Sequence, residues 1–142
     1  MGSYGAGILA ISESTGRALV LLRSALVSEP LTWAPPGGGD EPFDDGSVRW
    51  TGVREFIEET GHRPSGRILP LAVVQNDTGP YHQFVLLEQD EFVPQLDWEN
   101  AGAMWLTFEE LLGLPGKHPE FEDLLANSVV QRDLYTLMEG IS

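Results

Sequence analysis

The stretch that decides the interpretation of this chain runs from Arg54 to Gly61 and reads Arg-Glu-Phe-Ile-Glu-Glu-Thr-Gly. Side chains three and four positions apart are neighbours on a helix, so this order can place Glu55, Glu58 and Glu59 on one side. Each like-charged pair at that spacing costs about 0.2–0.5 kcal/mol. Mg²⁺ binds carboxylate oxygens and keeps positions for water and substrate phosphates. The three glutamates alone are better explained as an acidic helix face exposed to solvent, and it is the residues around them that favour a divalent-metal site.

Three glycines at positions 37 to 39 precede this helix, within a connection from Ser24 to Gly46 that is rich in proline, glycine and aspartate. A connection of more than about 15 residues without structure of its own is usually functional or disordered. Glycine lets the backbone approach a ligand closely, although a plain turn would also explain these three residues. Together with the acidic helix, the glycines predict a phosphate-sized space beside a metal site.

The acidic helix is expected to begin near Ser47 and to end at Gly61. Either the Ser47 hydroxyl or the Asp45 carboxylate could cap its first turn, and a glycine is the usual residue just past a helix end. An apolar stripe at three- and four-residue spacing predicts the face that packs on the core, and it comprises Val53, Phe56 and Ile57.

The rest of the chain mixes strand and helix patterns. Two continuously apolar runs, Gly7 to Ile11 and Ala18 to Leu22, predict a hairpin of buried strands. Further strands are expected at 67–75, 81–87 and 103–106, and helices at 108–112 and 119–139. The core contacts expected from the last helix are Leu124, Leu125, Val129, Leu134 and Leu137. Without an internal repeat, these elements indicate one layered α/β or α+β domain over residues 1–142.

Charge limits the classes of partner. The chain has 22 acidic and 8 basic residues, a formal net charge of −14. Such a field repels nucleic-acid backbones, so no nucleic-acid partner is expected. A phosphorylated substrate would be repelled as well unless bound cations offset the charge locally.

Cysteine is absent, which excludes disulfides, zinc–thiolate sites and cysteine nucleophiles. The N-terminal stretch from Met1 to Gly7 lacks the basic segment and apolar run of a secretion signal, and no run approaches the length of a membrane span. We therefore expect a cytoplasmic protein without a membrane partner.

The segment from Gly38 to Gly61 resembles the signature of the Nudix hydrolases, which cleave a nucleoside diphosphate linked to another group. That signature is a glycine, five residues, a glutamate, seven residues, and then Arg-Glu-aliphatic-any-Glu-Glu-any-Gly-aliphatic. The second half is matched by residues 54–61, with Phe56 as a large apolar substitute. Such a run is more specific than a lone glycine motif.

The first half departs from the family pattern. Counted from Gly39, Asp45 stands where the family has glutamate, and Gly46 is interpreted as a one-residue insertion. His62 occupies the final aliphatic position. Further segments resemble the usual layout of the family and extend the likeness over most of the fold: Leu21-Leu22-Arg23, Trp33, Trp98-Glu99-Asn100 and Trp105 to Leu111.

The resemblance implies an α/β/α sandwich around a central mixed sheet, and it implies roles for residues at matching positions. Glu55, Glu58 and Glu59 would bind Mg²⁺, or Mn²⁺, together with a backbone carbonyl at Gly38 or Gly39. The bound metal ions would neutralise the diphosphate and activate water. Arg54 would support the ligand geometry. The residues expected to contact substrate are Arg23, Gly38, Gly39 and Tyr81.

The sequence does not decide which residue is the general base. Glu99 is the first candidate and the helix glutamates Glu58 and Glu59 are the second, ahead of Asp97 and Glu91. Of the three histidines, His82 is the one whose strand could face a substrate. Trp33, Phe43 and Tyr81 could stack on a nucleobase, although Trp33 is better explained as a core residue.

The substrate also stays open among nucleotide sugars, ADP-ribose, dinucleoside polyphosphates and modified nucleoside triphosphates. The resemblance implies a small nucleotide as partner and makes a homodimer a reasonable expectation. The alternative function is a Nudix-like domain that binds a nucleotide or a protein without hydrolysing it.

Overall fold

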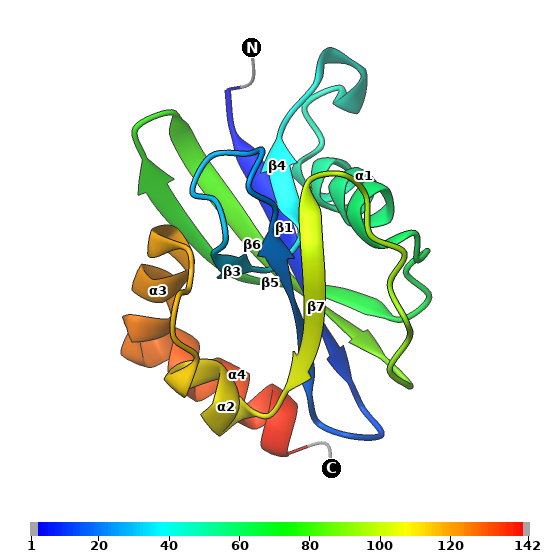
Figure 1. The fold of residues 1–142 in the computed structure, drawn as a ribbon, viewed down its shortest axis with the longest axis vertical. Coiled ribbons are helices and arrows are strands. Elements are labelled where there is room, and N and C mark those ends of the chain that lie inside the picture. Colours follow the sequence, from blue (N-terminus) through cyan, green and yellow to red (C-terminus); the bar gives the residue numbers. More distant parts are fainter. Residues whose placement is uncertain (1–2, 141–142) are drawn as a thin grey trace.

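The chain forms one mixed sheet with helices on both faces (Figure 1). The computed structural model describes residues 3–140, so the two terminal residues at each end of the predicted domain, including the start of the stretch inspected for a secretion signal, lie outside the described residues. The strands are β1 (Gly5–Ser12), β2 (Ala18–Arg23), β3 (Trp33–Ala34), β4 (Gly37–Gly39), β5 (Arg67–Asn76), β6 (Gly79–Glu88) and β7 (Asn100–Leu106). The helices are η1 (Pro42–Asp44, 3-10), α1 (Val48–Thr60), α2 (Phe108–Gly113), α3 (Pro119–Ala126) and α4 (Ser128–Glu139).

Strand β1 organises the sheet. One edge pairs with β6 in parallel along its whole length, whereas the other named pairings are antiparallel, which makes the sheet mixed as expected. The second edge of β1 is shared: β2 meets it at Ile11 and Ala18, and β4 pairs with its first residues. The connection from Ser24 to Gly46 is therefore not structureless, because it contributes β3, β4 and η1.

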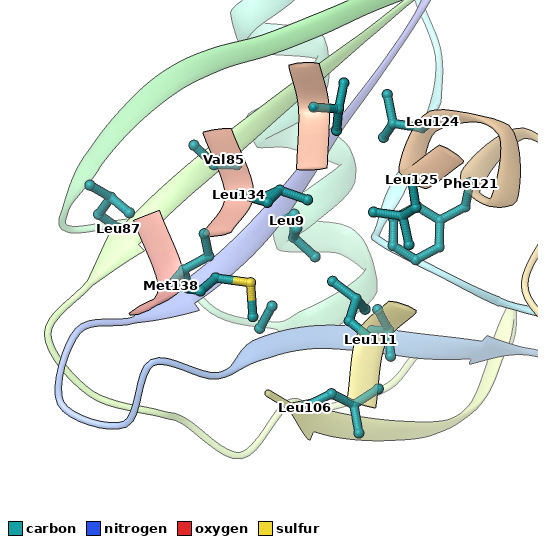
Figure 2. Close-up of a cluster of buried hydrophobic side chains, with 14 residues drawn as sticks. Leu9, Val85, Leu87, Leu106, Leu111, Phe121, Leu124, Leu125, Leu134 and Met138 are labelled. Atoms are coloured by element: carbon teal, nitrogen blue, oxygen red, sulfur yellow. The ribbon is translucent and has the colours of Figure 1, made fainter. Parts of the chain in front are cut away.

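Alternate residues of the central strands supply two apolar clusters, because successive side chains point to opposite faces of a sheet. Leu9 and Ile11 face α2, α3 and α4 in the cluster drawn in Figure 2. Ile8 and Ala10 face α1 in the second cluster, which includes Phe56. The predicted buried hairpin is confirmed, and the alternation produces the three layers.

Helix α1 has the bounds that its local sequence predicts. The Ser47 hydroxyl accepts a hydrogen bond from the backbone N–H of Trp50 at 3.2 Å, and Gly61 takes the left-handed conformation (φ 70°) that ends the helix. The other cap candidate, Asp45, lies outside the helix at the end of η1. Phe56 is fully buried and Val53 packs against the same cluster.

The C-terminal helical segment differs from the prediction. Instead of one helix over 119–139 there are two, because Asn127 takes an extended conformation (φ −75°, ψ 125°). Its side-chain oxygen accepts hydrogen bonds from Val129 and Val130 N–H groups at 2.9 and 3.1 Å, which starts α4. The break resets the helical phase, so Val130 is buried and Val129, predicted in the core, is 52% exposed.

The remaining core predictions for this segment agree with the structure. Leu124, Leu125 and Leu134 are buried, and Leu137 packs against their cluster. Trp33 is also partly buried against this cluster, as expected, whereas Phe43 is exposed. Within residues 3–140, no helix has both the length and the apolar character needed to cross a membrane.

We predict that Asn127→Ala lowers the free energy of unfolding by about 1 kcal/mol, because the first turn of α4 loses its side-chain acceptor. Asn127→Asp should cost much less, since aspartate accepts the same hydrogen bonds. Urea titration followed by circular dichroism measures both variants. Equal losses for the two substitutions would show that the cap does not stabilise this junction.

Candidate metal centre

Helix α1 directs its carboxylates toward the glycine strand β4. Glu59 is buried at 7% exposure, the Glu55 side chain is 13% exposed, and the Glu58 side chain is 51% exposed. The three glutamates therefore share one side of the helix but not one environment: two lie in the protein and one borders solvent.

Arg54, in the middle of α1, connects this helix to the preceding 3-10 helix η1 and to the end of β4. Its Nε and Nη2 atoms donate to the two oxygens of Asp44 at 2.9 and 3.0 Å, and Nη2 also donates to the Gly39 carbonyl at 3.0 Å. Nη1 donates to Glu55 at 3.0 Å and more weakly to Glu58 at 3.3 Å. Bidentate hydrogen bonds from Arg54 lower the pKa of Asp44 to about 2, so this buried carboxyl stays ionised.

The Glu55 carboxyl group packs directly on Gly38. A methyl group added at Gly38 would lie 2.6 Å from the carboxyl carbon of Glu55, so a side chain there would push the Glu55 carboxyl group out of this position. Only glycine permits this approach. The glycine strand therefore brings backbone amide and carbonyl groups within reach of whatever Glu55 binds.

Glu59 is fixed by one donor on each oxygen. The backbone N–H of Gly37 donates to Oε2 at 3.0 Å, and the Asn100 side chain donates through Nδ2 to Oε1 at 2.8 Å. These contacts tie α1 to β4 and to the start of β7. Each carboxylate oxygen keeps a lone pair for another partner.

Glu99 completes a cluster of three carboxyl groups. It lies in the loop before β7, and one of its oxygens, one of Glu55 and one of Glu59 all lie within 4.8 Å of one another. The structure thus unites Glu55 and Glu59 with the candidate base Glu99, from a loop 40 residues further along the chain. We call Glu55, Glu59 and Glu99 the carboxylate cluster.

Two predicted metal ligands stand apart from the carboxylate cluster. Glu58 is the half-exposed glutamate next to it and contacts Arg54. The Gly39 carbonyl accepts a hydrogen bond from the same arginine.

Burial raises the pKa values of the clustered carboxyls. Burial is the largest cause for Glu59, whose pKa rises to about 9 with help from the charges of Glu55 and Glu99, against the opposing hydrogen bonds from Asn100 and Gly37. Burial also raises the pKa of Glu55, and the neighbouring Glu58 charge adds to the increase while Arg54 opposes it. The pKa of Glu99 is raised by burial and then by Asp97 and Glu55. Without a cation, the surroundings therefore do not compensate the charge of a fully ionised cluster, and Glu59 keeps a proton up to about pH 9.

This donor set fits a divalent cation. Hard cations take oxygen ligands, and two oxygens bound to one Mg²⁺ at about 2.1 Å can be separated by up to about 4.2 Å. The carboxylate cluster is already gathered within 4.8 Å, so small side-chain rotations suffice to close it around an ion. A bound cation would also compensate the charge of the ionised carboxylates, which burial disfavours.

A pocket opens beside the carboxylate cluster, on the other side of the glycine strand. It contains about 640 Å³ of space, part of it open to solvent, and is lined from β4 by Gly37 and Gly38. The remaining lining comprises Arg23, Ala34, Pro35, Val74, Tyr81, Gln83, His118, Glu120, Phe121 and Leu124. Apolar walls with a few polar groups are typical of a small-molecule site.

All four residues predicted to contact substrate lie where the glycine strand β4 borders the pocket. Arg23, Gly38 and Tyr81 line the pocket, and Gly39 follows at the end of β4. The Tyr81 hydroxyl lies against Gly7 and Gly37, where any side chain at either glycine would collide with it. Arg23 donates to the Ser28 carbonyl at 2.9 Å and so is held at the pocket rim.

The other residues predicted as candidates for the site lie outside the carboxylate cluster and the pocket. Tyr81 and Gln83 line the pocket, so the intervening His82 points to the opposite face of the sheet and contacts Tyr4. Glu91 forms an ion pair with Arg17 at 2.6 Å. Asp97 accepts a hydrogen bond from the Glu99 N–H at 3.1 Å and thus shapes the loop that carries Glu99.

Two residues of the site were missed by sequence reasoning. The loop carboxylate that pairs with Arg54 is Asp44, because η1 turns Asp44 inward and leaves its neighbour Asp45 exposed in a left-handed conformation. The contact of Asn100 with Glu59 spans 41 residues and leaves no local pattern in the sequence. The sequence shows two acidic residues before Gly46, but it does not show whether Asp44 or Asp45 contacts Arg54.

Comparisons with known proteins agree with this geometry. A family model described as a NUDIX domain matches residues 2–127. No curated protein matches the chain.

Several solved structures share the fold at low sequence identity. The NUDIX domain of Shewanella oneidensis NrtR, solved in complex with ADP ribose, is 18% identical with a TM-score of 0.73, over 94% of this chain and 89% of that chain. A MutT protein from Methanosarcina mazei is 23% identical with a TM-score of 0.68, over 92% and 91%. An Ap4A hydrolase from C. elegans is 19% identical with a TM-score of 0.64, over 96% and 98%.

The mixed sheet, the glutamate helix beside a glycine strand and the family match over residues 2–127 lead to one conclusion. The chain belongs to the Nudix family.

Proposed function

We propose that this protein hydrolyses the pyrophosphate linkage of a nucleoside diphosphate joined to another group, with Mg²⁺ or Mn²⁺ as cofactor. The observation that carries the proposal is the carboxylate cluster of Glu55, Glu59 and Glu99, which adjoins both a glycine strand and an open pocket. A chain with a net charge of −14 needs a local positive charge to bind such an anion.

Glu55 and Glu59 hold the cation, and the half-exposed Glu58, which shares the Arg54 Nη1 donor with Glu55, joins them when substrate binds. The cation, when bound, supplies charge neutralisation for the diphosphate and acidifies a water molecule. Arg54 keeps Glu55 and the Gly39 carbonyl in place through the hydrogen bonds described above. Arg54 is thus a support for the ligands.

Glu99 is the general base of the proposed reaction. One of its carboxylate oxygens lies within 4.8 Å of the proposed cation ligands, and its loop position leaves it partly exposed to solvent. The proton moves from the attacking water to a Glu99 carboxylate oxygen as the new P–O bond forms, and the nucleoside phosphate or its partner group leaves. Glu58 and Glu59 remain the second candidates for this role.

Substrate contacts come from the glycine strand and the pocket. The backbone of Gly38 and Gly39 lies beside the cluster and so is suited to the diphosphate, while Arg23 and Tyr81 are suited to the group attached to it. The pocket also offers Glu120 and Gln83 as acceptors and His118 as a donor, because its Nδ1 accepts from the Glu120 N–H and leaves Nε2 with the proton. Burial lowers the pKa of His118 and favours this neutral form.

The candidate substrates are nucleotide sugars, ADP-ribose, dinucleoside polyphosphates and modified nucleoside triphosphates. The NrtR domain bound to ADP ribose and the C. elegans Ap4A hydrolase share only the fold at this identity, so they suggest members of the assay panel. The alternative of a binding domain without hydrolysis predicts nucleotide binding but no product in that panel.

We predict Mg²⁺-dependent turnover of at least one compound in this panel, measured as released phosphate or nucleoside monophosphate. Glu59→Gln should lower turnover by at least about a hundredfold, because a ligand of the cation loses its charge. Glu58→Gln should lower turnover on the same scale if its carboxylate joins the cation in the substrate complex.

The control for both variants is Glu109→Gln, which removes one negative charge from an exposed position on α2. It should leave turnover unchanged. Activity that persists in EDTA, or a fully active Glu59→Gln variant, would contradict the proposed chemistry. An unchanged Glu58→Gln variant would remove Glu58 from the ligand set.

We predict that Mg²⁺ stabilises the protein more strongly as pH rises from about 6 to 9. Below its pKa of about 9, Glu59 in the metal-free protein binds a proton that a cation must displace, so cation affinity increases with pH up to that value. Thermal unfolding with and without Mg²⁺ at several pH values measures the effect. In Glu59→Gln the pH dependence of the Mg²⁺ shift should be strongly reduced; an unchanged dependence would mean that Glu59 is not the proton-binding group.

A further inference from the structure

The carboxylate cluster joins two segments that are distant in the sequence, and Asn100 is the side chain that connects them. Asn100 is the first residue of β7 and is buried at 8% exposure. Its Nδ2 donates to Glu59 Oε1 at 2.8 Å and to Asp97 Oδ1 at 3.2 Å. One amide therefore links a helix glutamate to the turn that presents Glu99.

The other contacts of this loop hold its backbone. The Gln95 N–H donates to the Thr60 carbonyl at 2.7 Å, and the Ser24 N–H donates to the Glu99 carbonyl at 2.8 Å. Neither contact touches a carboxylate of the cluster. Among residues 3–140, the side-chain hydrogen bond between this loop region and a clustered glutamate of α1 is the one from Asn100.

An asparagine suits this position for electrostatic reasons. Its two N–H groups bind two carboxylates at once without adding charge. A lysine or arginine would also bind them, but it would neutralise negative charge that a cation needs. An aspartate would have the same shape but would repel both neighbours, so the amide holds the carboxylates while leaving their charge intact.

The two hydrogen bonds to Glu59 go to different oxygens of its carboxylate. The Gly37 N–H takes one lone pair of Oε2 and the Asn100 amide takes one of Oε1. The rotamer of Glu59 is thereby fixed, and each oxygen retains a lone pair. Hydrogen bonds of this kind to ligating carboxylates typically change metal affinity by 10–100-fold when they are removed.

We infer that Asn100 is a positioning residue of the metal centre, which fixes the Glu59 carboxylate and holds the Asp97–Glu99 turn beside it. The inference rests on the proposed function, since it assigns Asn100 a role toward the cation of the proposed hydrolase. Asn100 does not bind the cation or the substrate itself.

The test is binding of Mn²⁺ alone, measured by calorimetry or by electron paramagnetic resonance in the absence of nucleotide. Asn100→Leu keeps the approximate volume of the side chain and removes both donors. Its Mn²⁺ dissociation constant should rise at least about tenfold over that of the unmodified chain. The Mg²⁺ concentration for half-maximal turnover should rise in parallel.

A matched control variant distinguishes an effect of lower protein stability on Mn²⁺ binding from an effect of a misplaced Glu59 carboxylate. Asn127→Ala loses a capping amide far from the site and should bind Mn²⁺ as the unmodified chain does. Asn100→Ala is titrated beside Asn100→Leu, so that the result does not depend on how leucine packs. Melting temperatures in EDTA establish that each variant is folded during the titration.

The outcomes are distinguishable. Weaker Mn²⁺ binding in both Asn100 variants, with binding retained in Asn127→Ala, supports the inference even if no substrate in the panel is hydrolysed, a result that would count against the proposed function alone. Mn²⁺ binding equal to that of the unmodified chain in either folded Asn100 variant, while Glu59→Gln loses it, would overturn the positioning role and leave the proposed function standing. Failure of the unmodified chain to bind Mn²⁺ would overturn both.

Discussion

Repulsion among buried carboxylates is the constraint on which the rest of the structure depends. At about 4 Å and an effective dielectric constant near 20, two unit charges interact by roughly 4 kcal/mol. One oxygen from each of Glu55, Glu59 and Glu99 lies within 4.8 Å of the others, and burial adds to the cost of ionising all three. The fold tolerates this because neighbouring N–H groups bind Glu55 and Glu59, and the proposed cation would offset the remaining charge.

The geometry of the sheet provides the place for this cluster. Strands β1 and β2 meet at Ile11 and Ala18, and the remaining edge of β1 is occupied by the glycine strand β4. Since β4 carries no side chains, α1 can bring Glu55 onto Gly38 while Glu59 reaches the Gly37 N–H. The pocket lies beside the same strand, so one short segment connects the proposed metal site with the proposed substrate site.

Patterns among neighbouring residues predicted most of the helices and strands. The wrong predictions for the C-terminal helical segment share one cause. Ser47 and Gly61 mark the ends of α1 because capping requires only neighbouring residues. Asn127 was not recognised as a break, because an asparagine inside an amphipathic pattern is compatible with a continuous helix. The choice between Val129 and Val130 as core residue then followed from the wrong helical phase. With the break at Asn127, α3 and α4 each pack their own apolar residues on the sheet.

The sequence by itself determined the glutamate helix, the glycine segment before it and the family, because these features depend on spacings of a few residues along the chain. The tertiary structure alone decided which carboxyl groups meet. It placed Glu99 with Glu55 and Glu59, left Glu58 at the solvent border, and joined Asn100 to Glu59 across 41 residues. Such contacts follow from strand order and loop course, and a residue spacing along the sequence contains no information about either.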